Sequence, residues 1–188
     1  MSFLIRSRSL TLSPFEEALF WIVDLKEIRE EEVKEAMGFL DEETLGRVNK
    51  LVFIEDRQRS IIVHAILRIY LEEFSKKKPE ILRGAFGKPY LKDQTLHFNI
   101  SHKKQYAFLG FHPQRPIGVD IEEFHPPLGL PYEWCAMEAL LKAKGTGFTV
   151  NPPQLFQLSS DCFVAEGWSV YVYSDKIEGH KLAVCLVD

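Results

Sequence analysis

Two acidic residues, Asp120 and Glu122, are the side chains of this sequence best placed to do chemistry. They lie in the apolar run Ile-Gly-Val-Asp-Ile-Glu, which predicts a strand over residues 117–122. Residues two apart on a strand project from the same face. Two neighbouring carboxylates repel each other unless a cation lies between them, and Mg²⁺ suits such a pair because it leaves positions for phosphate oxygens and water. By itself the pair therefore fits either a metal site or a solvated acidic strand face.

A third acidic group, Glu138, stands four residues before Lys142 in a segment that predicts a helix over residues 132–144. Residues four apart on a helix lie on one face, so the two side chains are neighbours. Glu138 could be a further metal ligand or a general base, and Lys142 a cation that steadies a phosphate or a leaving group. An ordinary intrahelical ion pair is the alternative.

Several other polar residues could contact phosphate groups. Ser101 and His102 end a predicted strand and offer a hydroxyl and an imidazole, and Lys88 lies in a Gly-Lys-Pro turn. Arg47 and Arg59 belong to a loose basic series around the start of a predicted helix. Each has an ordinary structural alternative: a histidine that ends a strand, an exposed lysine, a solvated helix face. Only their combination indicates a phosphate site.

The composition is that of an ordinary globular protein. A chain of 188 residues can bury a core as one large domain or as two small lobes in contact. The net charge of −4 provides no bulk attraction to nucleic acid or anionic membranes. The three cysteines form no CxxC pair, and residues 1–14 lack an apolar stretch of signal-peptide length. We therefore predict a cytoplasmic protein without a nucleic-acid or membrane partner.

The hydrophobic pattern predicts how the chain divides into helices and strands. Strands are expected over residues 17–24, 96–101, 106–111, 117–122, 154–158, 168–173 and 181–187. Helices are expected over residues 26–39, from 41–43 onward, over 55–76 and over 132–144. Residues 1–14 predict a flexible lead-in or an edge strand, and the Pro-rich residues 125–131 a stiff connection. Because helices and strands do not alternate strictly, their order favours an α+β fold with antiparallel sheets.

The order of four sequence blocks resembles that of the 4'-phosphopantetheinyl transferases, in particular the larger, two-lobed, surfactin-synthetase-activating type. The blocks are Gly87-Lys88-Pro89, Phe98-Asn99-Ile100-Ser101-His102, Gly118-Val119-Asp120-Ile121-Glu122 and Trp134-x-x-x-Glu138-Ala139-x-x-Lys142-x-x-Gly145-x-Gly147. The likeness extends upstream to Glu55-Asp56-x-x-Arg59-Ser60 and downstream to residues 181–185. It covers the chain from about residue 17 to the end, and the four blocks together are far more specific than any one of them.

The resemblance implies an α+β fold of two pseudo-duplicated lobes. Each lobe would be a small antiparallel sheet packed on a long helix, with the coenzyme A cleft between the lobes. We expect an N-terminal lead-in over residues 1–16, a first lobe over 17–105 and a second lobe over 106–188. We also expect the protein to be a monomer.

The resemblance further implies a function and roles for individual residues. The 4'-phosphopantetheine group of coenzyme A would be transferred to a serine of an apo acyl or peptidyl carrier protein. Asp120, Glu122 and Glu138 would hold Mg²⁺, Glu138 would be the base, and Lys142 would neutralise or protonate the leaving oxygen. The implied coenzyme-binding residues are Arg47, Arg59, Ser60, Lys88, Ser101 and His102.

Two departures from the family pattern favour alternatives. The lysine that usually precedes the helix glutamate is Met137 here. Only 11 residues separate Glu122 from Trp134, where the resembled type usually carries a segment that covers the cleft and helps to meet the carrier. The main alternative is thus a catalytically impaired coenzyme A-binding homologue. A Mg²⁺-dependent hydrolase of nucleotide or coenzyme phosphates is a third hypothesis.

Overall fold

The computed structural model describes residues 1–123, 132–147 and 153–187, and it has an α+β fold built on antiparallel sheets. The first sheet has four strands in the order β1 (Ser7–Leu10), β2 (Leu19–Asp24), β6 (Tyr106–His112) and β5 (His97–Lys103). The second has five in the order β7 (Ile117–Glu123), β11 (His180–Val187), β10 (Trp168–Ile177), β9 (Cys162–Ala165) and β8 (Phe156–Ser159). A two-stranded ribbon pairs β3 (Ile81–Arg83) with β4 (Pro89–Leu91). The helices are η1 (Ser2–Arg6), α1 (Glu30–Met37), α2 (Glu42–Val48), α3 (Ile54–Ser75) and α4 (Tyr132–Lys144).

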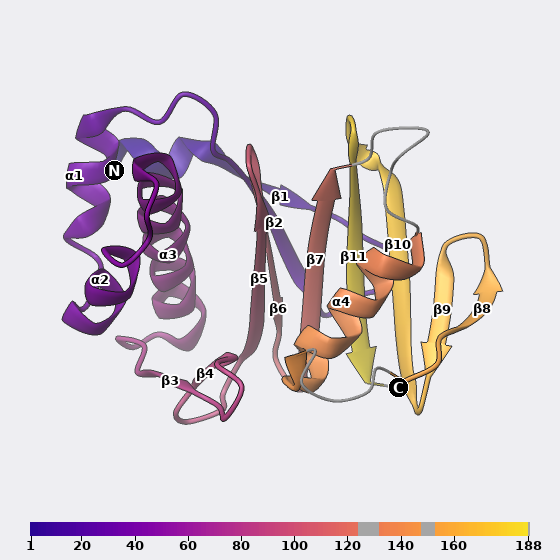
Figure 1. Cartoon of the computed structure of the whole chain (residues 1–188). Helices are drawn as coiled ribbons and strands as arrows, with labels where there is room; N and C mark the ends of the chain where they lie inside the picture. Colours follow the sequence, from indigo (N-terminus) through magenta and orange to yellow (C-terminus); the bar gives the residue numbers. More distant parts are fainter. Residues whose placement is uncertain (124–131, 148–152, 188) are drawn as a thin grey trace.

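The elements form four layers, with α3 and α4 outside and the two sheets between them (Figure 1). One core lies between α3 and the first sheet, a second between the two sheets, and a third between the second sheet and α4. Side chains of Phe20 and Phe108 on the first sheet meet Val119 and Leu182 on the second. Each lobe is therefore a sheet packed on a helix, as the resemblance implies.

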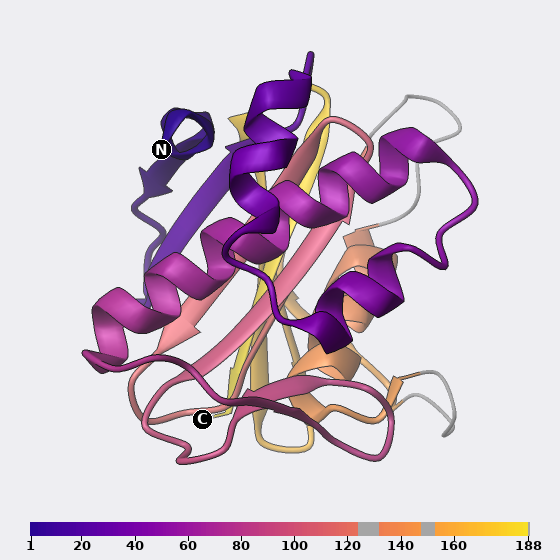
Figure 2. The ribbon, with the colours of Figure 1, turned by 90° about the vertical axis from the view of Figure 1, so that its left-hand side faces the viewer.

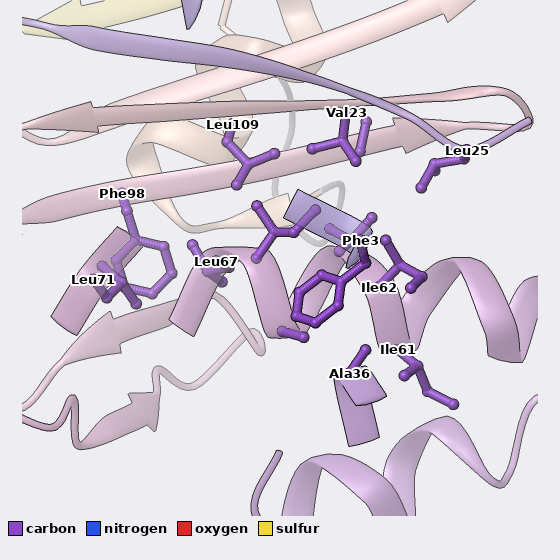
Figure 3. Packing of buried hydrophobic residues seen from close by; sticks show 14 of the residues in the cluster. Phe3, Val23, Leu25, Ala36, Ile61, Ile62, Leu67, Leu71, Phe98 and Leu109 are labelled. Atoms are coloured by element: carbon purple, nitrogen blue, oxygen red, sulfur yellow. The ribbon is translucent and has the colours of Figure 1, made fainter. Parts of the chain in front are cut away.

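Helix α3 runs across the face of the first sheet, and α1 and α2 lie on its outer side (Figure 2). Glu55 and Asp56 complement the dipole of its first turn, and Lys76 ends it in the left-handed conformation. The buried stripe includes Ile62 and Ile66, which are fully buried; burial of each such side chain contributes roughly 1.5–3 kcal/mol. Figure 3 shows Ile62 and Leu67 packed with Phe3, Val23 and Leu109.

The N-terminal segment is held to the first lobe. Phe3 is fully buried in the core beside α3, and β1 pairs with β2 as the edge strand of the first sheet. Arg6 forms an ion pair of 2.6 Å with the buried Glu32 of α1. Of the two expectations for residues 1–14, the edge strand is the one found.

The helix expected over residues 26–39 is confined to α1, and η1 and the short strands β3, β4 and β9 were not predicted. The chain passes from the first sheet to the second between β6 and β7. The division into lobes at residues 105 and 106 stays a prediction. The predicted connection 125–131 lies outside the described residues. In the described ranges no helix is both long and apolar enough to cross a membrane.

Helix α4 crosses directly over β7 because one residue of the strand has no side chain. A Cβ added at Gly118 would lie 2.0 Å from the carbonyl oxygen of Ala139 and 2.4 Å from the amide nitrogen of Ala143. Backbone atoms of a helix cannot yield by that much without movement of the whole helix. Gly118 therefore sets how closely α4, with Glu138 and Lys142, approaches the strand that carries Asp120.

We predict that Gly118→Ala destabilises the fold by about 3 kcal/mol or more, because the added methyl group displaces α4 from β7. Urea unfolding followed by circular dichroism measures the change in the free energy of unfolding.

The control is Gly46→Ala in α2, where an added Cβ meets nothing within 4 Å. That variant should be neutral or more stable by up to about 1 kcal/mol, since alanine favours a helix interior over glycine. Equal stability of Gly118→Ala and the unchanged protein would show that the close crossing is not a constraint.

Candidate functional site

The two lobes meet at β5 and β7, which lie side by side without pairing as strands (Figure 1). Side chains of β5 make the connection instead. The buried Asn99 accepts a hydrogen bond from the backbone N–H of Val119 through its Oδ1 at 2.9 Å. The buried Ser101 hydroxyl donates to Asp120 Oδ1 at 2.9 Å. The first acidic candidate is thus placed by a hydroxyl from the other lobe.

Three carboxylates converge at this junction. Asp120, Glu122 and Glu138 each offer one oxygen, and these oxygens all lie within 4.8 Å of one another. Asp120 and Glu122 are on the same face of β7 and both are buried, whereas Glu138 comes from α4. Asp120 Oδ2 is buried and has no hydrogen-bond partner among the described residues. An all-carboxylate set with a free buried oxygen fits a hard divalent cation such as Mg²⁺.

Two lysines partly balance the charge of the carboxylates. Lys142 Nζ lies 2.5 Å from Asp120 Oδ1, 2.8 Å from Ser101 Oγ and 3.4 Å from Glu138. Lys103 Nζ forms an ion pair with Glu122 Oε2 at 2.6 Å. The angles of this contact are not those of a hydrogen bond. The predicted neighbours Glu138 and Lys142 therefore do more than pair with each other, because Lys142 also connects both lobes.

The pKa of Glu138 lies above its ordinary value. Burial is the main cause, and the negative charge of Asp120 acts in the same direction, with Lys142 opposing both. The direction agrees with the geometry, since a carboxylate beside two others is hard to ionise without a cation.

A cleft of about 370 Å³ opens beside the carboxylates and is walled by both lobes. The first lobe contributes the turn Phe86, Gly87, Lys88 and Pro89, and the second contributes Glu138, Leu141, Lys142, Gly145 and Gly147. The wall is largely apolar apart from the charged side chains. Of the sequence-based candidates, Lys88, Glu138 and Lys142 thus line this cleft.

The Lys88 ammonium group does not point freely into that cleft. It donates to the backbone carbonyl of Ile117 at 3.1 Å and to that of Ala143 at 2.7 Å. Burial lowers the pKa of Lys88 to about 8.

His102 and Arg59 lie at the rim of the same junction. His102 projects from β5 with an accessible face, yet the protein around the ring lowers its pKa, and the charges of Lys142 and Arg59 act in the same direction. Arg59, on α3, pairs with Asp56 at 3.0 Å. His102 therefore lies within the electrostatic reach of Lys142 and Arg59.

A second polar cluster lies between α2, α3 and β3. Arg47, His64, Arg68 and Arg83 line a small cavity there, together with apolar residues. Arg47 Nε is buried and has no hydrogen-bond partner among the residues that the structure describes. Arg68 forms an ion pair with Asp41. The negative charge that acts on Arg83 is that of Glu43. Two arginines, Arg47 and Arg83, thus lie beside the partly buried His64 at this cavity.

The structure separates the sequence-based candidates into groups. Ser101, Asp120, Glu122, Glu138 and Lys142 form one cluster, with Lys88, His102 and Arg59 around it. Arg47 belongs instead to the second cluster, where Ser60 lies buried 3.3 Å from His64 Nδ1. The sequence analysis did not single out His64 or Arg83. Arg83 could have been found from its position five residues before the phosphate candidate Lys88.

Comparison with known proteins identifies similar chains. The family model described as 4'-phosphopantetheinyl transferase, N-terminal, matches residues 27–114, a range that ends between β6 and β7 and before the carboxylates. A phosphopantetheinyl transferase of Thraustochytrium sp. is 33% identical over 48% of this chain and 33% of its own length. A 4'-phosphopantetheinyl transferase of Bacillus subtilis is 31% identical over 53% and 46%. A putative 4'-phosphopantetheinyl transferase of Synechocystis sp. is 27% identical over 60% and 59%. The alignments thus span less than two thirds of each relative.

The pKa of His64 generates a prediction for stability. Burial, with the charges of Arg47 and Arg83, lowers this pKa from 6.5 to about 4, against a hydrogen bond to Ser60 that raises it. Between pH 6.5 and 4 the unfolded chain therefore binds a proton that the folded chain does not, so stability falls as the pH is lowered through this window. The loss from pH 7 to pH 5 should be about 2 kcal/mol.

Urea unfolding at pH 7 and pH 5 tests this prediction, with His64→Gln as the reference that lacks the titrating group. The unchanged protein should lose more stability than the variant over the same interval. An NMR titration of the His64 ring provides a direct check, and a midpoint at or above pH 6.5 would contradict the assignment.

Proposed function

Because the chain belongs to the 4'-phosphopantetheinyl transferase superfamily, we propose that it transfers the 4'-phosphopantetheine group of coenzyme A to a serine of an apo acyl or peptidyl carrier protein. The observation that carries the proposal is the convergence of Asp120, Glu122 and Glu138 beside Lys142, at the wall of a cleft between two lobes. The two-lobed arrangement supports the larger type within the superfamily.

Asp120, Glu122 and Glu138 would hold a Mg²⁺ ion, since their oxygens converge and Asp120 Oδ2 is buried without a partner in the described chain. When bound, Mg²⁺ supplies positive charge to the pyrophosphate oxygens as negative charge develops on them. The Ser101 hydroxyl, which donates to Asp120 Oδ1, keeps that carboxylate oriented from the opposite lobe.

Glu138 is the proposed base, because it is the carboxylate that borders the cleft. It accepts the proton of the carrier serine, directly or through a water molecule. The serine oxygen then bonds to the β-phosphorus, the bond from that phosphorus to the bridging oxygen breaks, and 3',5'-adenosine bisphosphate leaves. Lys142 stands one helical turn away on the same face and stabilises the charge on the departing oxygen, or protonates it.

The remaining candidates other than Lys88 are proposed to bind the coenzyme. Ser101 and His102, with Arg59 at the rim, would contact the phosphates near the reacting centre, and Ser60 would lie on the nucleotide side. Arg47 is proposed to bind the 3'-phosphate, together with Arg83 from the same cavity, because two arginines suit a dianion. Lys88 lines the cleft beside Glu138 and Lys142.

The proposed setting is a cytoplasmic monomer that acts on coenzyme A and a carrier protein, without a nucleic-acid or membrane partner. The net charge of −4 supports this setting, since it provides no general attraction to polyanions.

The alternative, an impaired coenzyme A-binding homologue, is supported by the 11 residues between Glu122 and Trp134 and by Met137. Calorimetry separates the two. Coenzyme binding that does not depend on Mg²⁺, without turnover on any carrier, supports the impaired homologue. Release of a hydrolysed coenzyme product without a carrier would support the hydrolase instead.

The direct test is incubation with fluorescent coenzyme A, Mg²⁺ and a panel of apo acyl and peptidyl carrier proteins. We expect labelling of at least one carrier, seen as a fluorescent band and as the mass of the added arm. Folded protein that labels none of them would exclude the proposed activity for those carriers and favour the impaired homologue.

Glu138→Gln should lower the turnover number by at least about 10²-fold while the fold is kept, because the amide cannot accept the serine proton. The matched control is Glu133→Gln, an exposed position in the first turn of the same helix, which should keep near-normal turnover. Near-normal activity of Glu138→Gln would remove Glu138 from the role of base.

Arg83→Met should weaken binding of coenzyme A by about 10- to 100-fold, since it removes a charged hydrogen bond to the 3'-phosphate. Calorimetry with 3'-dephospho-coenzyme A is the control, because that ligand lacks the group and should bind both proteins alike. Equal losses for both ligands would place the 3'-phosphate elsewhere.

A further inference from the structure

Lys88 is a residue of the first lobe whose charged end is fixed to the second lobe. Its ammonium nitrogen donates to the carbonyl oxygen of Ile117, at the start of β7, and to that of Ala143, in the last turn of α4. Among the described residues Lys88 makes no ion pair with a carboxylate. Two backbone carbonyls from two elements are therefore its partners.

The end of α4 is shaped to receive this side chain. Gly145 has a φ of +73°, and its N–H donates to the carbonyl of Leu141 at 2.8 Å, as is usual where a helix ends. A Cβ added at Gly145 would lie 3.1 Å from Lys88 Cδ, so the methylene groups of the lysine pack closely against this glycine. A cation at the last carbonyls of a helix is also favoured by the helix dipole.

The position of this contact matters because α4 carries the reacting groups. Ala143 directly follows Lys142 and lies five residues after Glu138. A short helix moves as a rigid unit, so fixing its last turn against the first lobe fixes where both side chains point. The Lys142 ammonium must meet Asp120 and Ser101 within a few tenths of an ångström for its contacts of 2.5 and 2.8 Å to form.

We propose that Lys88 is a positioning residue, which holds the C-terminal end of α4 against the first lobe and thereby aligns Glu138 and Lys142 with the carboxylates of β7. This inference rests on the proposed function for its consequence in catalysis. We propose this role in place of a direct contact between the Lys88 ammonium and a coenzyme phosphate. Two of the three N–H groups of the ammonium are already used, and the side chain is largely enclosed.

Lys88→Met tests the proposal, since methionine keeps most of the side-chain length and removes the ammonium. Binding of Mg²⁺ to the protein without coenzyme, measured by calorimetry, should weaken on the order of tenfold, the size expected when support of a metal ligand is lost. Amide hydrogen exchange over residues 141–145 should become faster. The turnover number should fall while KM for coenzyme A stays nearly constant.

The matched control is Lys92→Met, near the same ribbon, where the lysine is exposed and pairs with Glu80. This variant should leave metal binding, exchange and turnover unchanged. Lys88→Arg is the second variant, and it also serves as the test if Lys88→Met does not fold. It keeps the positive charge, but its larger planar group must disturb the close packing of residue 88 against Gly145, so metal affinity should still fall while coenzyme affinity is kept.

The outcomes separate three readings. Unchanged Mg²⁺ affinity and exchange in Lys88→Met, with weaker coenzyme binding, would overturn the proposal and assign Lys88 to a phosphate. Loss of global stability alone, with unchanged Mg²⁺ affinity well below the unfolding temperature, would also overturn it. Should the unchanged protein bind no Mg²⁺, the proposed function fails. The proposal for Lys88 is then decided by amide exchange in α4, where unchanged protection refutes it.

Discussion

The structure depends on how two strands that do not pair with each other, β5 and β7, are held together. Strands of one sheet are joined by backbone hydrogen bonds, but these two belong to different sheets and must be joined by side chains. Asn99 takes the place of a backbone acceptor for the Val119 N–H, and the Ser101 hydroxyl donates a hydrogen bond to Asp120. Because the same side chains link the lobes and orient a carboxylate, the geometry of the candidate site and the lobe contact are not separable.

The charge balance of the junction follows from that arrangement. Buried carboxylates are costly unless they are paired, and here Lys142 and Lys103 approach Asp120 and Glu122 from α4 and from the first lobe. The pairing is incomplete, since Asp120 Oδ2 stays without a partner in the described chain. A junction that is held together yet retains a free buried oxygen is suited to take up a cation, which supports the proposed metal site.

The close crossing of α4 and β7 explains how a chain with a short connection can still assemble the three carboxylates. Gly118 lets the helix lie directly on the strand, so Glu138 reaches Asp120 without help from a longer intervening segment. Lys88 contacts the same half of the helix, at the carbonyl of Ala143. The placement of the cluster therefore depends on how the C-terminal half of α4 packs rather than on the length of the connection.

The sequence by itself determined the local structure and the chemical inventory. Helical spacing predicted α3, strand-like runs predicted β5, β6 and β7, and period two placed Asp120 and Glu122 on one face, because these features depend on neighbours along the chain. Short strands such as β3 and β9 were missed because only their partners stabilise them. Only the tertiary structure decided that Lys88 ends on backbone carbonyls, that Arg47 joins Arg83 and His64 in a separate cavity, and that Ser101 reaches Asp120. Each of these contacts joins residues far apart in sequence, and their distances are set by how the layers pack, which no local pattern encodes.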